Sequence, residues 1–212
     1  MLTESVGPRN DAGEIAVPRL TLDNNCLIAL DHEESAAPDL RRLISAYRAG
    51  LVHLCVVAIG ASERSRAGVR SLTEFESRLA RIGLQNAEIL MTPWHLDLSL
   101  LGFSTMLVSE EGAALVETLY RALFPTDGDG SYAGFCASHD HVPDDDWHEK
   151  WLNRRCDALT LWAHLNNAGD IFITIDSNFH KKTRKPALIA LGAKAIMRPA
   201  EAVCYLESEV MP

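Results

Sequence analysis

The strongest constraint on the fold is a nearly continuous apolar run over residues 51–59, which is rich in valine. A strand of this composition is typically buried on both faces, as in a parallel sheet that helices cover on both sides. A second run, β-branched and aromatic, covers residues 171–175, and segments with the apolar spacing of helices alternate with these runs. We therefore expect an α/β fold of three layers, α/β/α, with a mainly parallel central sheet.

Local signals give the expected order of the elements. Pro38 and Pro199 are placed to open helices, and Gly50, Gly83 and Gly169 are placed to end them. The expected strands cover residues 19–22, 51–59, 171–175 and 194–197. The expected helices cover residues 26–30, 38–49, about 75–82, 110–123, 147–168, about 188–191, and the segment from 199 onward.

The chain of 212 residues suits a single domain. We assign residues 1–18 to a flexible leader, residues 19–206 to the domain and residues 207–212 to a tail. The regular spacing of apolar residues becomes weaker over about residues 84–146. We interpret this segment as a partly helical insertion.

Composition limits the classes of function. Twenty Lys and Arg against 29 Asp and Glu give a net charge of −9, which argues against a protein that coats duplex nucleic acid through a basic surface. No apolar run approaches the roughly 18 residues that a membrane span needs, and the leader has no secretory pattern. We expect a cytoplasmic protein with no membrane partner, whose five separated cysteines are reduced core residues.

Four acids are expected to meet at one edge of the sheet. Asp23, Glu63 and Asp176 each follow a predicted strand closely, and the carboxyl ends of parallel strands share the edge where ligands bind. Asp157 lies in the helix that precedes residues 171–175. Because that helix must run antiparallel to the strand, Asp157 falls toward the same edge.

Each acid alone has a simpler interpretation. Asp23 and Asp176 could cap helices, Glu63 could be a solvated acid, and Asp157 could pair with Arg154 on its own helix. Carboxylates crowded together repel, however, and need a cation to compensate. Oxygen ligands without His or Cys suit Mg²⁺ or Mn²⁺, which activate water and stabilise phosphate during in-line displacement. We expect one or two such ions.

Five segments resemble a known family. TLDNNCLIAL, AIGASER, CDALTLWAHL and ITIDSNF resemble, in that order, the four acidic motifs of the PIN domain, and KPALIALGAKAIMRPAEAV is similar to its closing helix, strand and helix. The resemblance implies a metal-dependent endoribonuclease that cuts single-stranded RNA by metal-activated water. It implies that Asp23, Glu63, Asp157 and Asp176 are the metal-holding and catalytic residues. It also implies that water or the ligands are positioned by Asn25, Ser62, Ser177 and Asn178.

Basic residues flank two of these acids. Arg154 and Arg155 precede Asp157, and a basic run follows Asp176. A basic rim around an acidic centre suits a phosphodiester, although such a run can also be a solvated loop. The expected RNA contacts are Arg154, His180, Lys181, Lys182, Arg184 and Lys185. Trp151 and Trp162, at helical spacing, are expected in the core rather than on bases.

Other interpretations stay open at this stage. The domain could be a catalytically silent module that binds RNA or a protein, and the resemblance also leaves open a toxin with an antitoxin-like partner and a homodimer. A haloacid dehalogenase-type phosphatase would need an acid where Asn25 stands. A Zn²⁺ site is a further alternative, with ligands drawn from Cys136, His139, Asp140, His141, Asp144, Asp145, Asp146 and His148.

Overall fold

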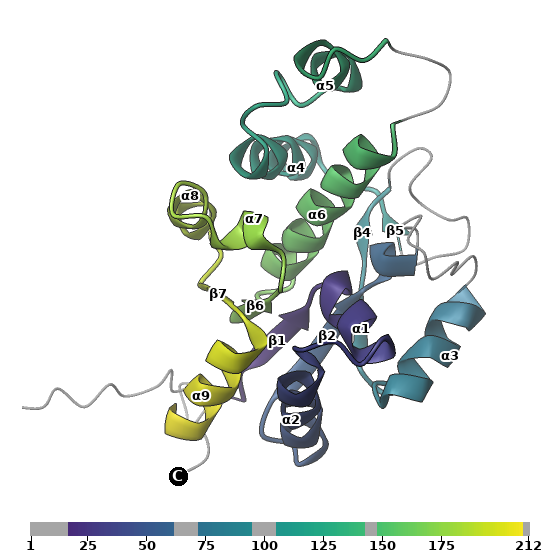
Figure 1. Ribbon diagram of the computed structural model, residues 1–212, viewed down its shortest axis with the longest axis vertical. Helices are drawn as coiled ribbons and strands as arrows, with labels where there is room; N and C mark the ends of the chain where they lie inside the picture. The colour runs from purple at the N-terminus through teal and green to yellow at the C-terminus, as the bar shows by residue number, and fades with distance from the viewer. Residues whose placement is uncertain (1–16, 62–71, 95–104, 143–147, 210–212) are drawn as a thin grey trace, which may run out of the picture.

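The computed structural model describes residues 17–61, 72–94, 105–142 and 148–209. Its centre is a five-stranded, fully parallel sheet in the order β3-β2-β1-β6-β7 (Figure 1). The strands are β1 (Arg19–Leu22), β2 (His53–Val57), β3 (Glu88–Leu90), β6 (Ile171–Ile173) and β7 (Ala195–Met197). Helices cover both faces, so the predicted three-layer α/β/α architecture is confirmed.

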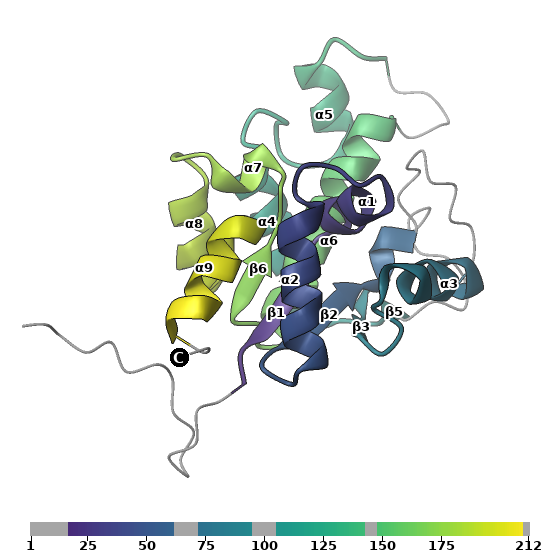
Figure 2. The ribbon, with the colours of Figure 1, turned by 60° about the horizontal axis from the view of Figure 1, so that its bottom comes forward.

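Each face of the sheet has its own core. One face packs against α1 (Asn24–Asp31), α2 (Ala37–Arg48), α3 (Leu72–Ile82) and α9 (Pro199–Glu209). Figure 2 shows α2 and α9 in front of the sheet and α6 behind it. Successive strand residues point to opposite cores, as Phe172 and its neighbours Ile171 and Ile173 do in β6.

The second core forms around α6, the longest helix that the structure describes (Glu149–Asn166). Trp151 and Trp162 are buried there, as predicted. Around α6 pack α4 (Glu110–Leu123), α5 (Tyr132–Ser138), α7 (Ser177–His180) and α8 (Lys185–Ala190). The helix α4 has the limits that the sequence predicted.

The segment expected as an insertion contributes to the central sheet. Strand β3 lies within it and pairs in parallel with β2 at the edge. Of its three residues only Leu90 is buried, so no apolar run marks this strand in the sequence, and it was not predicted. Two more short strands, β4 (Thr92–Pro93) and β5 (Thr105–Met106), form a separate parallel pair.

Two predicted strands are shorter than expected. The apolar run of residues 51–59 supplies β2 and then a 3₁₀ helix, η1 (Ala58–Ala61). Ala58 and Ile59 are buried although they are outside the strand, so the run records burial rather than strand length. Strand β6 likewise ends at Ile173, before the turn that carries Asp176.

The cysteines follow the prediction with one exception. All five are free thiols, and four are buried, but Cys204 on α9 is exposed rather than part of the core. Among the described helices, none combines the length and the apolar character required to cross a bilayer.

Gly169 is a position where a side chain should not fit. It follows α6, and a Cβ there would overlap the imidazole of His164. That ring is fully buried and is hydrogen-bonded to the hydroxyl of Thr21 at 2.9 Å, so it cannot move aside easily. We expect Gly169→Ala to lower the free energy of unfolding by about 1–3 kcal/mol, measured by urea denaturation.

The partner variant His164→Ala removes the ring that Gly169→Ala would strike. The double variant should therefore be much more stable than the sum of the two single effects predicts. If the losses in the free energy of unfolding simply add in the double variant, the overlap with His164 is not the reason that Gly169→Ala is destabilising.

Candidate functional site

Asp23 is buried at the carboxyl end of β1, where it caps α1. The residue is only 1% exposed, and its side chain accepts a hydrogen bond from the backbone N–H of Asn24 at 2.8 Å. Its other oxygen, Oδ2, accepts from Thr174 Oγ1 at 2.6 Å and from Asn25 Nδ2 at 3.2 Å. The capping interpretation of Asp23 is therefore correct, and Asn25 does contact it as the sequence suggested.

Capping does not explain the electrostatics of Asp23. Burial, and after it repulsion by the nearby charge of Asp176, raises the pKa of this carboxyl to about 6, although its three hydrogen bonds act in the opposite direction. Two acids from separate strands thus interact unfavourably at the carboxyl edge of the sheet. A cation bound between them would reverse this repulsion.

Thr174 links the two acids. Its hydroxyl donates to Asp23 and accepts from the backbone N–H of Asp176 at 3.0 Å. Thr174 is fully buried at the end of β6. The sequence did not single out this residue, although a Thr two positions before an Asp is a known turn-forming arrangement.

Asp176 caps α7 and is connected to the basic loop through Asn178. Asp176 accepts from the backbone N–H of Asn178 at 2.8 Å and from its side-chain amide at 3.3 Å. The amide oxygen of Asn178 in turn accepts from Lys181 Nζ at 3.0 Å and from Arg184 Nη1 at 2.6 Å. Asn178 therefore holds an acid on one side and two cations on the other.

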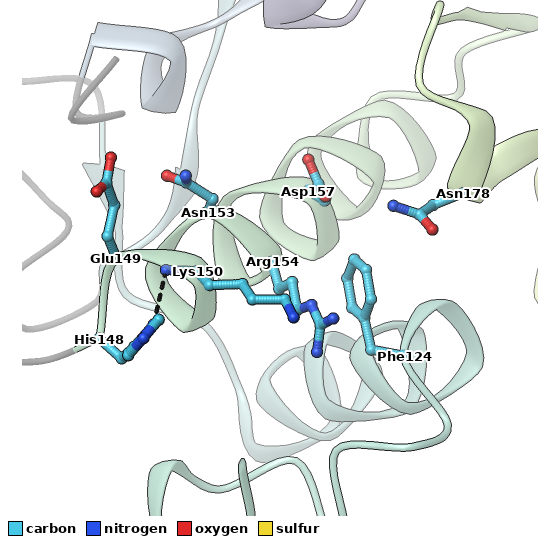
Figure 3. Close-up of a pocket in the computed structure, with 8 residues that line it drawn as sticks. All are labelled: Phe124, His148, Glu149, Lys150, Asn153, Arg154, Asp157 and Asn178. Carbon is cyan, nitrogen blue, oxygen red and sulfur yellow. Dashed lines mark hydrogen bonds between the residues drawn. The ribbon is translucent and has the colours of Figure 1, made fainter. Parts of the chain in front are cut away.

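Asp157 lies in a hollow of about 420 Å³ beside this group. Figure 3 shows Asp157 on α6 and Asn178 on α7 at the same hollow, with the ring of Phe124 close to both. The remaining lining residues come from the first turns of α6 and are His148, Glu149, Lys150, Asn153 and Arg154. Asp157 thus shares a hollow with Asn178, the residue that bonds to Asp176.

The structure brings together part of the predicted site. Asp23 and Asp176 are neighbours, and Asp157 lies at the hollow that Asn178 also lines. Glu63 and Ser62 lie outside the described residues, and Ser177 is exposed at the start of α7. Within the described ranges, no three His, Cys, Asp or Glu side chains gather closely enough to hold a metal ion. The oxygen donors suit a hard cation, but a complete ligand set needs at least one group beyond them.

The predicted RNA contacts fall into different environments. Arg154 forms an ion pair with the fully buried Asp127. Arg155 is buried against Glu117, at 2.6 Å, and is not part of a basic rim. His180 bonds back to the carbonyl of Thr174 at 2.9 Å.

The lysines of the basic run are further apart than their order suggests. Lys181 and Lys182 are exposed, and Lys181 bonds to Asn178. Lys185 lines a different hollow, next to β7. Lys181 and Arg184 are therefore the residues of this run that Asn178 connects to Asp176.

The histidines of the expected zinc alternative pack around an aromatic ring. His139 and His148 lie against Phe135, at centroid distances of 4.3 and 5.4 Å, and His141 meets His148 edge-on at 4.7 Å. These contacts are those of a packed aromatic cluster. Asp144, Asp145 and Asp146 lie outside the described residues.

Comparisons of the sequence with protein families and with curated proteins find no match. The chemistry of the site therefore has to follow from its own residues.

Proposed function

We propose that this chain is a Mg²⁺- or Mn²⁺-dependent endoribonuclease of the PIN type that hydrolyses single-stranded RNA. The observation that carries the proposal is the burial of Asp23 beside Asp176, with a pKa raised to about 6. Asn or Ser caps a helix as well as Asp does, so the cost of burying an ionisable carboxyl here is one that capping does not require. Perturbed acids of this kind cluster at functional sites.

In this proposal the metal is held by Asp23, Asp157, Asp176 and Glu63. A bound Mg²⁺ or Mn²⁺ would supply activation of water and neutralisation of charge on the phosphate. Thr174 ties the carboxyl of Asp23 to the backbone N–H of Asp176 through its hydroxyl.

Further groups support the same site. Asn178 orients Asp176 and holds Arg184 and Lys181 next to it, where they can attract the phosphate backbone. Asn25 steadies Asp23. Ser62 and Ser177 are proposed to position water, and an antitoxin-like partner or a homodimer would rest on the family resemblance alone.

A second candidate is an RNA-binding module without catalysis. It is favoured by the finding that the described residues hold no group of three metal-ligating side chains. In that case the basic residues near Asn178 would bind RNA, and the acids would serve only as caps.

Cleavage assays separate the two candidates. End-labelled RNA and single-stranded DNA of the same sequence are incubated with the protein in Mg²⁺, Mn²⁺ or EDTA. We expect cleavage of RNA that requires the metal and is lost in Asp23→Asn and in Asp157→Asn, because each removes a carboxylate from the proposed ligand set.

Glu76→Gln is the matched control, because this acid is exposed on α3, away from the site. It should cut as the wild type does. Equal traces from the wild type and both aspartate variants would contradict the proposed nuclease.

A further inference from the structure

The hollow beside Asp157 continues away from the acids, toward α4. Three elements form its walls: the end of α4 with Phe124, the first turns of α6, and Asn178 of α7 (Figure 3). Its volume of about 420 Å³ falls within the roughly 300–1,000 Å³ that is usual for small-molecule sites. The space therefore suits a group larger than the reacting phosphate alone.

Two guanidinium groups lie against the ring of Phe124. The Cζ atom of Arg154 is 4.9 Å from the ring centroid, and that of Arg184 is 5.7 Å away. The charge of Arg154 is matched by Asp127. Arg184 bonds to the neutral amide of Asn178, and within the described part of the chain it has no carboxylate partner in an ion pair.

Lys150 adds a further cation at the same hollow. Its side chain is exposed and runs alongside α6 toward Arg154 (Figure 3), and no described carboxylate forms an ion pair with it. Two acids, Glu149 and Asp157, also line the hollow, but Asp157 belongs to the proposed metal site. Lys150 is thus the cation in the lining that a ligand could pair with, and Arg184 is a second one beside the hollow, next to Asn178 and Phe124.

We infer that this hollow binds the nucleotide next to the cleaved bond, with Lys150 of its lining and Arg184 beside it contacting the phosphate of that nucleotide. The inference rests on the proposed function and adds a path for the RNA strand, from the acids past Arg184 toward Lys150. It makes the first turn of α6 part of the substrate site. It also separates Arg184 from Lys185, which lines the other hollow.

Binding without metal tests this inference apart from catalysis. Fluorescence anisotropy measures the affinity of a short, labelled single-stranded RNA in EDTA at several salt concentrations. We expect Arg184→Gln and Lys150→Gln each to weaken binding about three- to tenfold and to reduce the salt slope by about 0.7, the value for one phosphate contact on a single strand.

Arg48→Gln is the matched control. Arg48 is exposed at the end of α2, which leads into the start of β2 and therefore lies at the opposite edge of the sheet from Asp23. Its affinity and salt slope should equal those of the wild type. Equal urea midpoints for all variants would show that none of the changes disturbs the fold.

The outcomes distinguish the subsite from the nuclease. If Arg184→Gln and Lys150→Gln bind like Arg48→Gln, or if the wild type does not bind RNA in EDTA, the subsite is wrong, whatever the cleavage assay shows. If they bind weakly as expected but the wild type never cuts RNA with Mn²⁺, the subsite stands and the proposed nuclease fails.

Discussion

Replacing Asp23 by asparagine is expected to raise the free energy of unfolding at pH 8 by about 1–3 kcal/mol. The same change should remove the stabilisation that Mn²⁺ gives the wild type. The pKa of Asp23 is raised from 3.8 to about 6, chiefly by burial and then by Asp176, and a tenfold change in an acid dissociation constant corresponds to about 1.4 kcal/mol. The gain should fall short of the full value because an amide has only one acceptor oxygen, so it cannot accept from the Asn24 N–H as well as from Asn25 and Thr174, as the two carboxylate oxygens do.

The sign of the pH dependence follows from proton uptake. Between about pH 4 and pH 6 the folded chain keeps a proton on Asp23 that the unfolded chain has released. The contribution of Asp23 to the free energy of unfolding therefore falls as the pH rises through this window, and the loss is complete above it. Below pH 4 both states are protonated, and the advantage of Asp23→Asn should disappear.

His164 acts in the opposite direction over nearly the same window. Burial lowers its pKa from 6.5 to about 4, so the unfolded chain takes up a proton first and stability falls as the pH drops from 6.5 to 4. In the wild type the two effects largely cancel. Asp23→Asn should expose the loss due to His164, and its stability should drop by about 3 kcal/mol on acidification.

Urea denaturation at pH 4, 6 and 8 measures these differences, and added Mn²⁺ extends the test. A ligand that binds only the folded state raises its stability, so Mn²⁺ should stabilise the wild type at pH 8 but not Asp23→Asn. Glu76→Gln should follow the wild type throughout. A less stable Asp23→Asn at pH 8 would show that the carboxylate is a favourable cap rather than a buried acid kept for a ligand.

The layers of the fold were predictable because burial leaves a strong trace in composition. Runs such as residues 51–59 are apolar without alternation only when both faces of a strand are covered, and this condition fixes a helix layer on each side. In strand β3 only Leu90 is buried, so it leaves no such trace, whereas the other edge strand, β7, is framed in the sequence by Gly192 and Pro199. The sequence therefore predicts a strand where burial or closely flanking Gly and Pro mark it, and misses β3.

The acids of the site were predictable from their places after strands, but their partners were not. The positions of Asp23 and Asp176 follow from the rule that parallel strands end at one edge. Which cation faces which anion depends on side-chain directions in three dimensions. Arg154 is three residues from Asp157 on α6, but it forms an ion pair with Asp127 near α4. Helical spacing alone does not predict this ion pair.

Removal of Asp127 is expected to destabilise the chain strongly. It is fully buried between α4 and α5, where it pairs with Arg154 and accepts a hydrogen bond from the hydroxyl of Tyr120 at 2.7 Å. Asp127→Ala leaves a largely buried guanidinium without its carboxylate. We expect a loss of about 3–5 kcal/mol in the free energy of unfolding, measured by urea denaturation at pH 7.

Two companion variants identify the source of that loss. Tyr120→Phe removes only the hydrogen bond and should cost about 1 kcal/mol, whereas Asp127→Ala combined with Arg154→Met removes the unpaired charge and should recover much of the stability. If the double variant is no more stable than Asp127→Ala, the ion pair is not what holds α4 and α6 together. Recovery would mean that Asp127 acts by neutralising Arg154 under Phe124, which leaves Arg184 as the cation there that a phosphate could pair with.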